Sequence, residues 1–146
     1  MTQEDKEILL KDLCGRLPYG VCVEHTSGFS GTLHDITVYF TYNDDDTIKD
    51  YMCYTDFFGD ESCKIEFFKP YLFPLSSMTE EQKEEYYHIV NYISPDDTEN
   101  WAEGEFIYVD TTQFLRLINF YHRNHLDYRG LINGGLALDA TGKNIY

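Results

Sequence analysis

Two histidines stand three residues apart in the stretch HRNH, at positions 122 and 125, near the end of a predicted helix. This i, i+3 spacing places both imidazoles on one helical face, from which they can bind a zinc ion. A catalytic zinc needs a third protein ligand, and the chain has neither an HExxH motif nor a CxxC pair. We therefore expect no metal centre, with His122 and His125 as the candidate ligands if one exists. A histidine at a helix C-terminus also suits the unpaired carbonyl groups there, and we favour that interpretation.

Two clusters of acidic residues are the other candidates for a functional site. They are Asp44, Asp45 and Asp46 in the stretch NDDD, and Asp96, Asp97 and Glu99 in the stretch SPDDTEN. A calcium-binding EF-hand loop needs acids at alternate positions and a glycine at its sixth position, which contiguous aspartates do not provide. We therefore predict a hairpin turn at the first cluster and an acidic loop at the second.

The charge of the chain is strongly negative and unevenly distributed. The 26 acids and 11 bases give a formal net charge of −15. Residues 41–66 hold eight acids and two bases, and residues 80–105 hold nine acids and one base, whereas residues 110–146 are near neutral. Such charge repels nucleic acid and anionic membranes and favours basic partners. Tyrosine, with 13 copies, is suited to binding surfaces, so we expect Tyr51 and Tyr54 to join the acids as partner contacts.

The remaining motifs do not indicate an enzyme or a cofactor. The four cysteines form no CxxC pair, and they are predicted to be free thiols in a reducing compartment. The first residues lack the pattern of a signal peptide, and no segment has the length of a membrane span, so we expect a cytoplasmic protein. The glycine-rich stretches lack the context of a phosphate-binding loop, and the serines lack a nucleophile elbow.

The first half of the chain reads as one helix followed by four strands. Thr2 caps the helix and Pro18 ends it, with Leu10, Leu13, Cys14 and Leu17 on the expected apolar face. Period-two alternation predicts strands at 19–25, 33–42, 47–55 and 62–68. We expect an antiparallel meander, either an open sheet or a small barrel.

The second half reads as helical. Residues 69–78 contain two prolines and break the pattern, and 106–109 fits a short strand. Thr79 with Gln82 forms a capping box for a second helix, and a third begins at Asp110 or Thr111. Strands and helices are segregated, so the fold class is α+β. Residues 1–75 and 76–146 are the two expected parts, as separate units or as one compact domain.

The tail from His125 to Tyr146 is too rich in leucine and aromatic residues for a disordered segment. We predict that it docks on the second and third helices. The docking residues would be Leu131, Ile132, Leu136, Leu138 and Tyr146. Arg129 is expected to pair with an acid from the middle of the chain and thereby hold the tail in place.

Three blocks of the sequence carry a resemblance. They are LLKDLCGRLPYGV, KPYLFPLSSMTEEQKEE and HLDYRGLINGGLALDATGKNIY, about a third of the chain. They resemble blocks of a group of short, uncharacterised proteins from gut Bacteroidales, their phages and their integrated mobile elements. The resemblance implies an accessory protein in the cytoplasm of a bacterial host cell, and it implies no activity and no catalytic residues.

These observations favour a non-catalytic acidic protein that binds a basic host protein through a negative, tyrosine-rich surface. Neither nucleic acid nor a membrane is an expected partner, and the sequence leaves the oligomeric state open. The alternatives are a small-ligand-binding protein with an aromatic pocket and a self-assembling structural protein. An anionic ligand would require Arg116, Arg123 and Arg129 to converge.

Overall fold

A computed structural model describes residues 1–42, 47–56, 62–90 and 111–146, with the backbone alone at 39–42 and 47–50. The helices are α1 (Gln3–Arg16), α2 (Glu80–Val90) and α3 (Thr111–Arg123). The strands are β1 (Cys22–His25), β2 (Ser30–Tyr42), β3 (Thr47–Thr55), β4 (Ser62–Lys64), β5 (Phe68–Leu72) and β6 (Leu138–Asp139). The α+β class predicted from the sequence is therefore confirmed.

The sheet is open and mixed, with the order β4-β3-β2-β1-β5-β6. Its first four strands form the predicted antiparallel meander, but the prediction of four strands and the barrel alternative are wrong. β5 adds an antiparallel strand to β1, and β6 pairs with β5 in parallel. The predicted break at 69–78 thus begins inside a strand, which accepts Pro70 because β5 has only β1 beside it at that residue.

Local capping explains where two helices begin. The Thr2 side chain accepts the Asp5 backbone N–H at 3.1 Å, and the Asp5 carboxylate accepts the Thr2 N–H at 2.8 Å. Thr79 and Gln82 make the same reciprocal pair at the start of α2, with distances of 2.9 and 3.2 Å. Both capping predictions are confirmed because each bond spans only three residues of sequence. The predicted strand at 106–109 lies outside the described residues.

The core forms where α1 packs on the sheet, and it draws residues from both halves of the chain. Leu9 and Leu13 of α1 meet Val23 of β1 and Leu131 and Ala137 of the tail. The buried face of α1 differs from the predicted one, because Cys14 is exposed and Leu9, Asp12, Leu13 and Arg16 are buried. The last strand of the meander is also shorter than predicted. It ends at Lys64, and a 3-10 turn follows that leaves Phe67 40% exposed.

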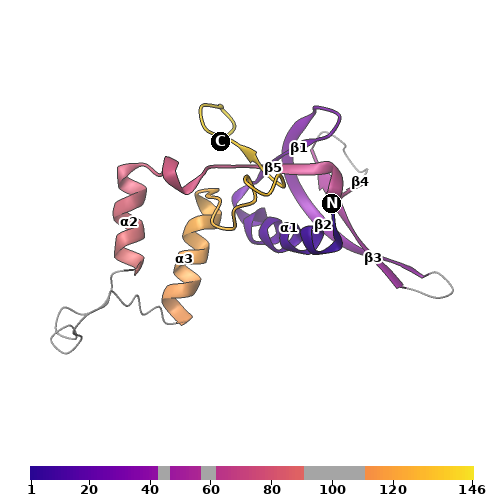
Figure 1. The fold of residues 1–146 in the computed structure, drawn as a ribbon, viewed down its shortest axis with the longest axis horizontal. Coiled ribbons are helices and arrows are strands. Elements are labelled where there is room, and N and C mark those ends of the chain that lie inside the picture. The colour runs from indigo at the N-terminus through magenta and orange to yellow at the C-terminus, as the bar shows by residue number, and fades with distance from the viewer. Residues whose placement is uncertain (43–46, 57–61, 91–110) are drawn as a thin grey trace.

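Figure 1 shows α2 and α3 on one side of the molecule, α1 against the sheet in the middle, and the β2–β3 hairpin projecting from the other side. α3 lies between α2 and α1, and the C-terminal segment runs back to β5. None of the helices in the described part of the chain has the length and apolar character needed to cross a membrane.

Candidate functional site

A buried ion pair on α1 is the centre of a cluster that we call the polar junction, made of Asp12, Arg16, His122, Tyr128 and Arg129. The Arg16 Nε and Nη2 atoms donate to the two Asp12 carboxylate oxygens at 2.7 and 3.0 Å. Both side chains are fully buried. The i, i+4 spacing on one helix lets the planar guanidinium meet the carboxylate in a two-bond arrangement.

The remaining donors of Arg16 reach the end of α3. They bond to the carbonyl oxygens of Tyr121 at 3.3 Å and Leu126 at 2.8 Å. The Tyr121 carbonyl also accepts the Leu126 backbone N–H at 2.9 Å, so Arg16 adds a second donor to it from a different element. The Arg129 Nε atom approaches the Asp12 carboxylate at 3.4 Å. Asp12 thus connects α1 to the tail, while Arg16 connects α1 to α3.

Close approach of α1 and α3 depends on Gly15. A Cβ atom at this position would lie 2.1 Å from the Cε1 atom of His122, which leaves no room for a larger residue. The His122 Nε2 atom shares a hydrogen bond of 3.0 Å with the Tyr128 hydroxyl, and Tyr128 stacks on Tyr121 with ring centroids 4.8 Å apart. Burial, aided by the Arg16 charge, lowers the pKa of His122, so this imidazole is neutral at pH 7.

His125 holds the last residue of the chain. Its ring stacks on Tyr146 with centroids 3.8 Å apart, and its backbone adopts a left-handed φ of 51°. The Tyr146 hydroxyl donates to the Tyr71 carbonyl at 2.6 Å and accepts the Cys22 N–H at 3.3 Å. Burial lowers the pKa of His125 to about 4, with a further contribution from Arg16.

The junction has the properties of a structural clamp. The Arg16 and Arg129 charges face the Asp12 carboxylate, and the two histidines lie against different tyrosine rings. Among the residues that the structure describes, no group of three or more His, Cys, Asp and Glu side chains could hold a metal ion. His122 and His125 therefore lie in separate contacts that fasten the tail.

The lowered histidine pKa values predict a loss of stability in mild acid. As the pH falls below the ordinary value of 6.5, the unfolded chain binds a proton at residue 125, whereas the folded chain does so only near pH 4. The free energy of unfolding should therefore fall by about 2–4 kcal/mol between pH 6.5 and pH 4, and His122 adds to the fall. Urea denaturation at a series of pH values between 6.5 and 4 measures this change in the free energy of unfolding.

His125→Asn is the matched variant, because asparagine tolerates the left-handed backbone and does not titrate. Its stability should change clearly less between pH 6.5 and pH 4 than that of the parent chain. An equal pH dependence in both proteins would show that His125 is not the group responsible.

The predicted partner contacts have different outcomes. Asp44, Asp45, Asp46, Asp96, Asp97 and Glu99 lie outside the described residues. Tyr51 is fully buried in the core beside Cys53, so the prediction that it contacts a partner is wrong. The reason is the phase of β3, whose alternation points Tyr51 and Cys53 inward. Tyr54 belongs to the opposite phase and is half-buried.

One described surface does combine exposed acids with an exposed tyrosine. We call it the acidic face of α2, and it consists of Glu80, Glu81, Glu84, Tyr87 and His88. All five side chains are exposed, and Tyr87 is 57% exposed. Their spacing keeps them on one side of the helix, while Gln82 and Tyr86 on the other side contact α3. Lys83 pairs with Glu80 at 2.6 Å, so part of the negative charge is balanced.

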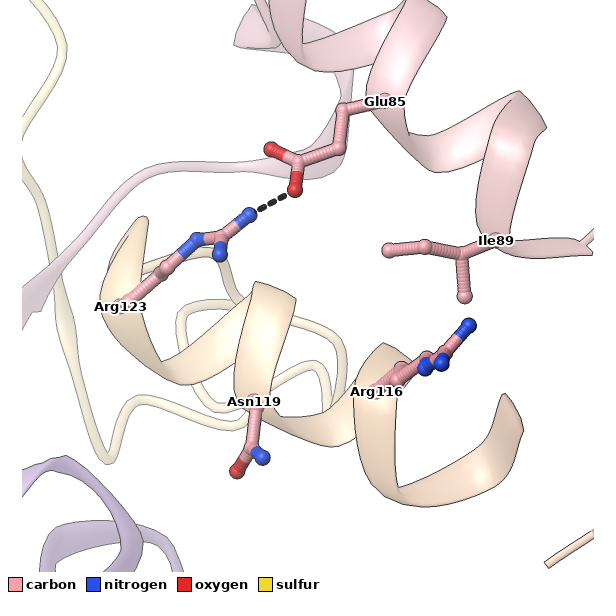
Figure 2. Close-up of a pocket in the computed structure, with 5 residues that line it drawn as sticks. All are labelled: Glu85, Ile89, Arg116, Asn119 and Arg123. Atoms are coloured by element: carbon pink, nitrogen blue, oxygen red, sulfur yellow. Dashed lines mark hydrogen bonds and ion pairs between the residues drawn. The ribbon is translucent and has the colours of Figure 1, made fainter. Parts of the chain in front are cut away.

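A small cleft separates α2 from α3, and Figure 2 shows the side chains that line it. It has a volume of about 230 Å³, and its lining residues are Glu85, Ile89, Arg116, Asn119 and Arg123. Arg123 forms an ion pair with Glu85 across the cleft. Arg129 belongs instead to the polar junction, where it lies over the Tyr128 ring, so the three arginines do not converge on an anion site.

No family model, curated protein or solved structure matches this chain. Contacts within the chain bring three distant segments, 9–16, 71–73 and 125–146, to one place. Arg16 bonds to the Leu126 carbonyl, and Phe73 and Leu72 exchange backbone bonds with Asp127, His125 and Ala140 at 2.8–2.9 Å.

The tail prediction is correct in part. The tail is ordered and its Leu131 enters the core, but it packs on α1 and β5 rather than on α2. Arg129 does pair with an acid, although that acid is Asp12 of α1 instead of one in the middle of the chain. Asp12, Gly15 and Arg16 were missed altogether. A usable signal existed, since Asp12 and Arg16 stand on the same helical face as Leu9 and Leu13.

Proposed function

We propose that this chain is a non-catalytic binding protein of a phage or mobile element and that it attaches to a basic surface of a host protein. The observation that carries the proposal is the acidic face of α2, where exposed glutamates surround the exposed Tyr87 ring. The formal net charge of −15 has the same sign as this face, and α2 belongs to the acidic stretch 80–105, which holds nine acids and one base.

The two kinds of side chain on this face have different roles in binding. Exposed carboxylates contribute modest affinity, but they accelerate encounter with a basic surface and orient it. A tyrosine ring supplies the apolar contact area that commonly dominates binding energy at the centre of an interface. α2 is held by α3 through Tyr86, which contacts Phe120 and Tyr121, so the face is presented on a rigid support.

Capture from a bacterial host lysate, followed by mass spectrometry, tests the proposal. Retention is expected at about 50 mM salt and loss at about 500 mM, because the Debye length is longer than about 10 Å at the lower concentration and only a few ångströms, on the order of 4 Å, at the higher one. A single basic host protein should be retained under the first condition. Retention that is the same at both salt concentrations would contradict a charge-driven interaction.

Substitutions on α2 test whether its acidic face is the binding surface. The double variant Glu81→Gln and Glu84→Gln should weaken affinity for the captured protein about fivefold to tenfold, and Tyr87→Ala should weaken it at least tenfold. Glu4→Gln with Glu7→Gln removes the same charge from α1 and serves as the matched control, for which about a twofold change is expected. Equal losses in both double variants would indicate that only net charge matters, which contradicts the assignment to α2.

A further inference from the structure

Within the described residues, no strand pairs with one edge of β2 along most of its length. β1 pairs with β2 only from Ser30 to Thr32, and the last bond between them joins the Leu33 N–H to the Val21 carbonyl at 2.9 Å. β3 occupies the opposite edge from Leu33 to Tyr42. Within the described residues, therefore, β2 has a single neighbouring strand beyond Leu33, and Figure 1 shows this hairpin projecting from the body of the molecule.

The hydrogen bonds show which residues direct their backbone groups to the open edge. The Leu33 N–H points to β1, and the register shift between Leu33 and Asp35 makes Ile36 the next residue with that direction. The Ile36 N–H confirms this direction, because it bonds at 2.7 Å to the Asp35 carboxylate rather than to β3. By alternation, Val38, Phe40 and Tyr42 also direct their N–H and C=O groups outward.

This edge lacks the features that normally keep strands from pairing with other chains. Natural edge strands carry lysine, proline or frequent bulges, or they are short. From Ile36 to Tyr42 the sequence ITVYFTY has no charge and no proline, and its residues all have high strand propensity. The bulge stands at the beginning of the segment, before Ile36. The outer edge of β3, in contrast, carries Lys49 and Asp50, and β4 covers its other end.

We propose that the open edge of β2 from Ile36 to Tyr42 is a strand-addition site for an extended basic segment of a partner protein. Backbone hydrogen bonds supply affinity in this mode, and alternate side chains supply specificity. Charge decides between the occupants. A second copy would bring another formal charge of −15 to the interface, whereas a segment with lysine or arginine meets the exposed Asp35 at the start of the edge. The site is distinct from the acidic face of α2, so substitutions there leave this test unaffected.

Amide hydrogen exchange by NMR tests the site without any substitution. In the free protein, the outward amides of Val38, Phe40 and Tyr42 should exchange at least about tenfold faster than the inward amides of Thr37, Tyr39 and Thr41. The probe is the blocked peptide Lys-Val-Thr-Val-Thr-Val-Lys at about 1 mM, which should slow the outward amides and leave the inward ones unchanged. The matched peptide with glutamate at both ends should have a clearly smaller effect.

Val38→Pro removes one outward N–H donor and leaves the bonds to β3 in place. Residue 38 is a position at which an edge strand accepts proline, because its N–H faces the open edge. Val38→Pro should weaken binding of the basic peptide at least about tenfold, whereas Val38→Thr, which keeps the N–H, should stay within about threefold. Equal binding by the two variants would overturn the proposal, and so would outward amides that are already as protected as inward ones. A dimer in sedimentation that Val38→Pro converts to monomer would also overturn it, because the occupant is then a second copy.

Discussion

Replacing Asp12 with alanine is expected to lower the free energy of unfolding by about 3–5 kcal/mol, the largest effect of any single substitution that we foresee. The change removes the carboxylate that accepts two bonds from Arg16 and lies 3.4 Å from Arg129. Arg16 is fully buried, so its charge would remain without a counter-ion in a region that excludes water. Urea denaturation followed by circular dichroism measures the loss.

Two further variants separate the charge effect from other causes. Asp5→Ala makes the same chemical change on the same helix at a partly exposed position, where it removes one capping bond, and should cost clearly less. The double variant Asp12→Leu and Arg16→Met removes both charges together, and it should recover a large part of the loss in Asp12→Ala. A small loss in Asp12→Ala, below about 1 kcal/mol, would mean that water reaches Arg16 and that the junction is not the clamp described here.

A chain that ends at Arg129 is expected to lose cooperative folding altogether. The deletion keeps Arg129 beside Asp12, but it removes Leu131 and Ala137 from the core, β6 from the sheet edge and Tyr146 from His125. Burying a leucine side chain stabilises a fold by about 1.5–3 kcal/mol, and burying a single methyl-sized group stabilises it by about 0.8 kcal/mol. A domain has only about 5–15 kcal/mol of net stability, so these losses, together with the lost β6 pairing and Tyr146 contacts, remove a large share of it.

Thermal melting followed by near-ultraviolet circular dichroism checks this outcome. Tyr146→Phe is the graded control, because it keeps the ring on His125 and removes only the hydroxyl with its bonds to Tyr71 and Cys22. That variant should remain folded and lose about 1–2 kcal/mol. A truncated chain that melts cooperatively near the temperature of the full chain would mean that the tail serves a partner instead of the fold.

Local interactions explain most of what could be predicted from the sequence. The caps at Thr2 and Thr79 depend on bonds between residues three positions apart. The alternation of apolar residues along β2 and β3 likewise belongs to the strands themselves, and the structure pairs them in the expected antiparallel order. These features need no knowledge of what packs against them.

The buried polar groups could not be predicted in the same way. Cys14 and Asp12 both adjoin Leu13, and the polarity of the two side chains favours the thiol inward and the acid outward. The structure reverses that arrangement because this side of α1 faces the end of α3 and the tail, where Arg16 donates to the Tyr121 and Leu126 carbonyls and Asp12 meets Arg129. Tyr51 was assigned to the surface for a similar reason, since tyrosine suits both a core and an interface.

The sequence by itself determined the charge of the protein, the starts of α1 and α2, the β2–β3 pairing and the ordered character of the tail. Only the tertiary structure decided the buried face of α1, the addition of β5 and β6, and the position of each histidine. The physical reason is distance along the chain. The bond from Arg16 to the Leu126 carbonyl joins residues 110 positions apart, and β6 has two residues, too few for any periodic pattern.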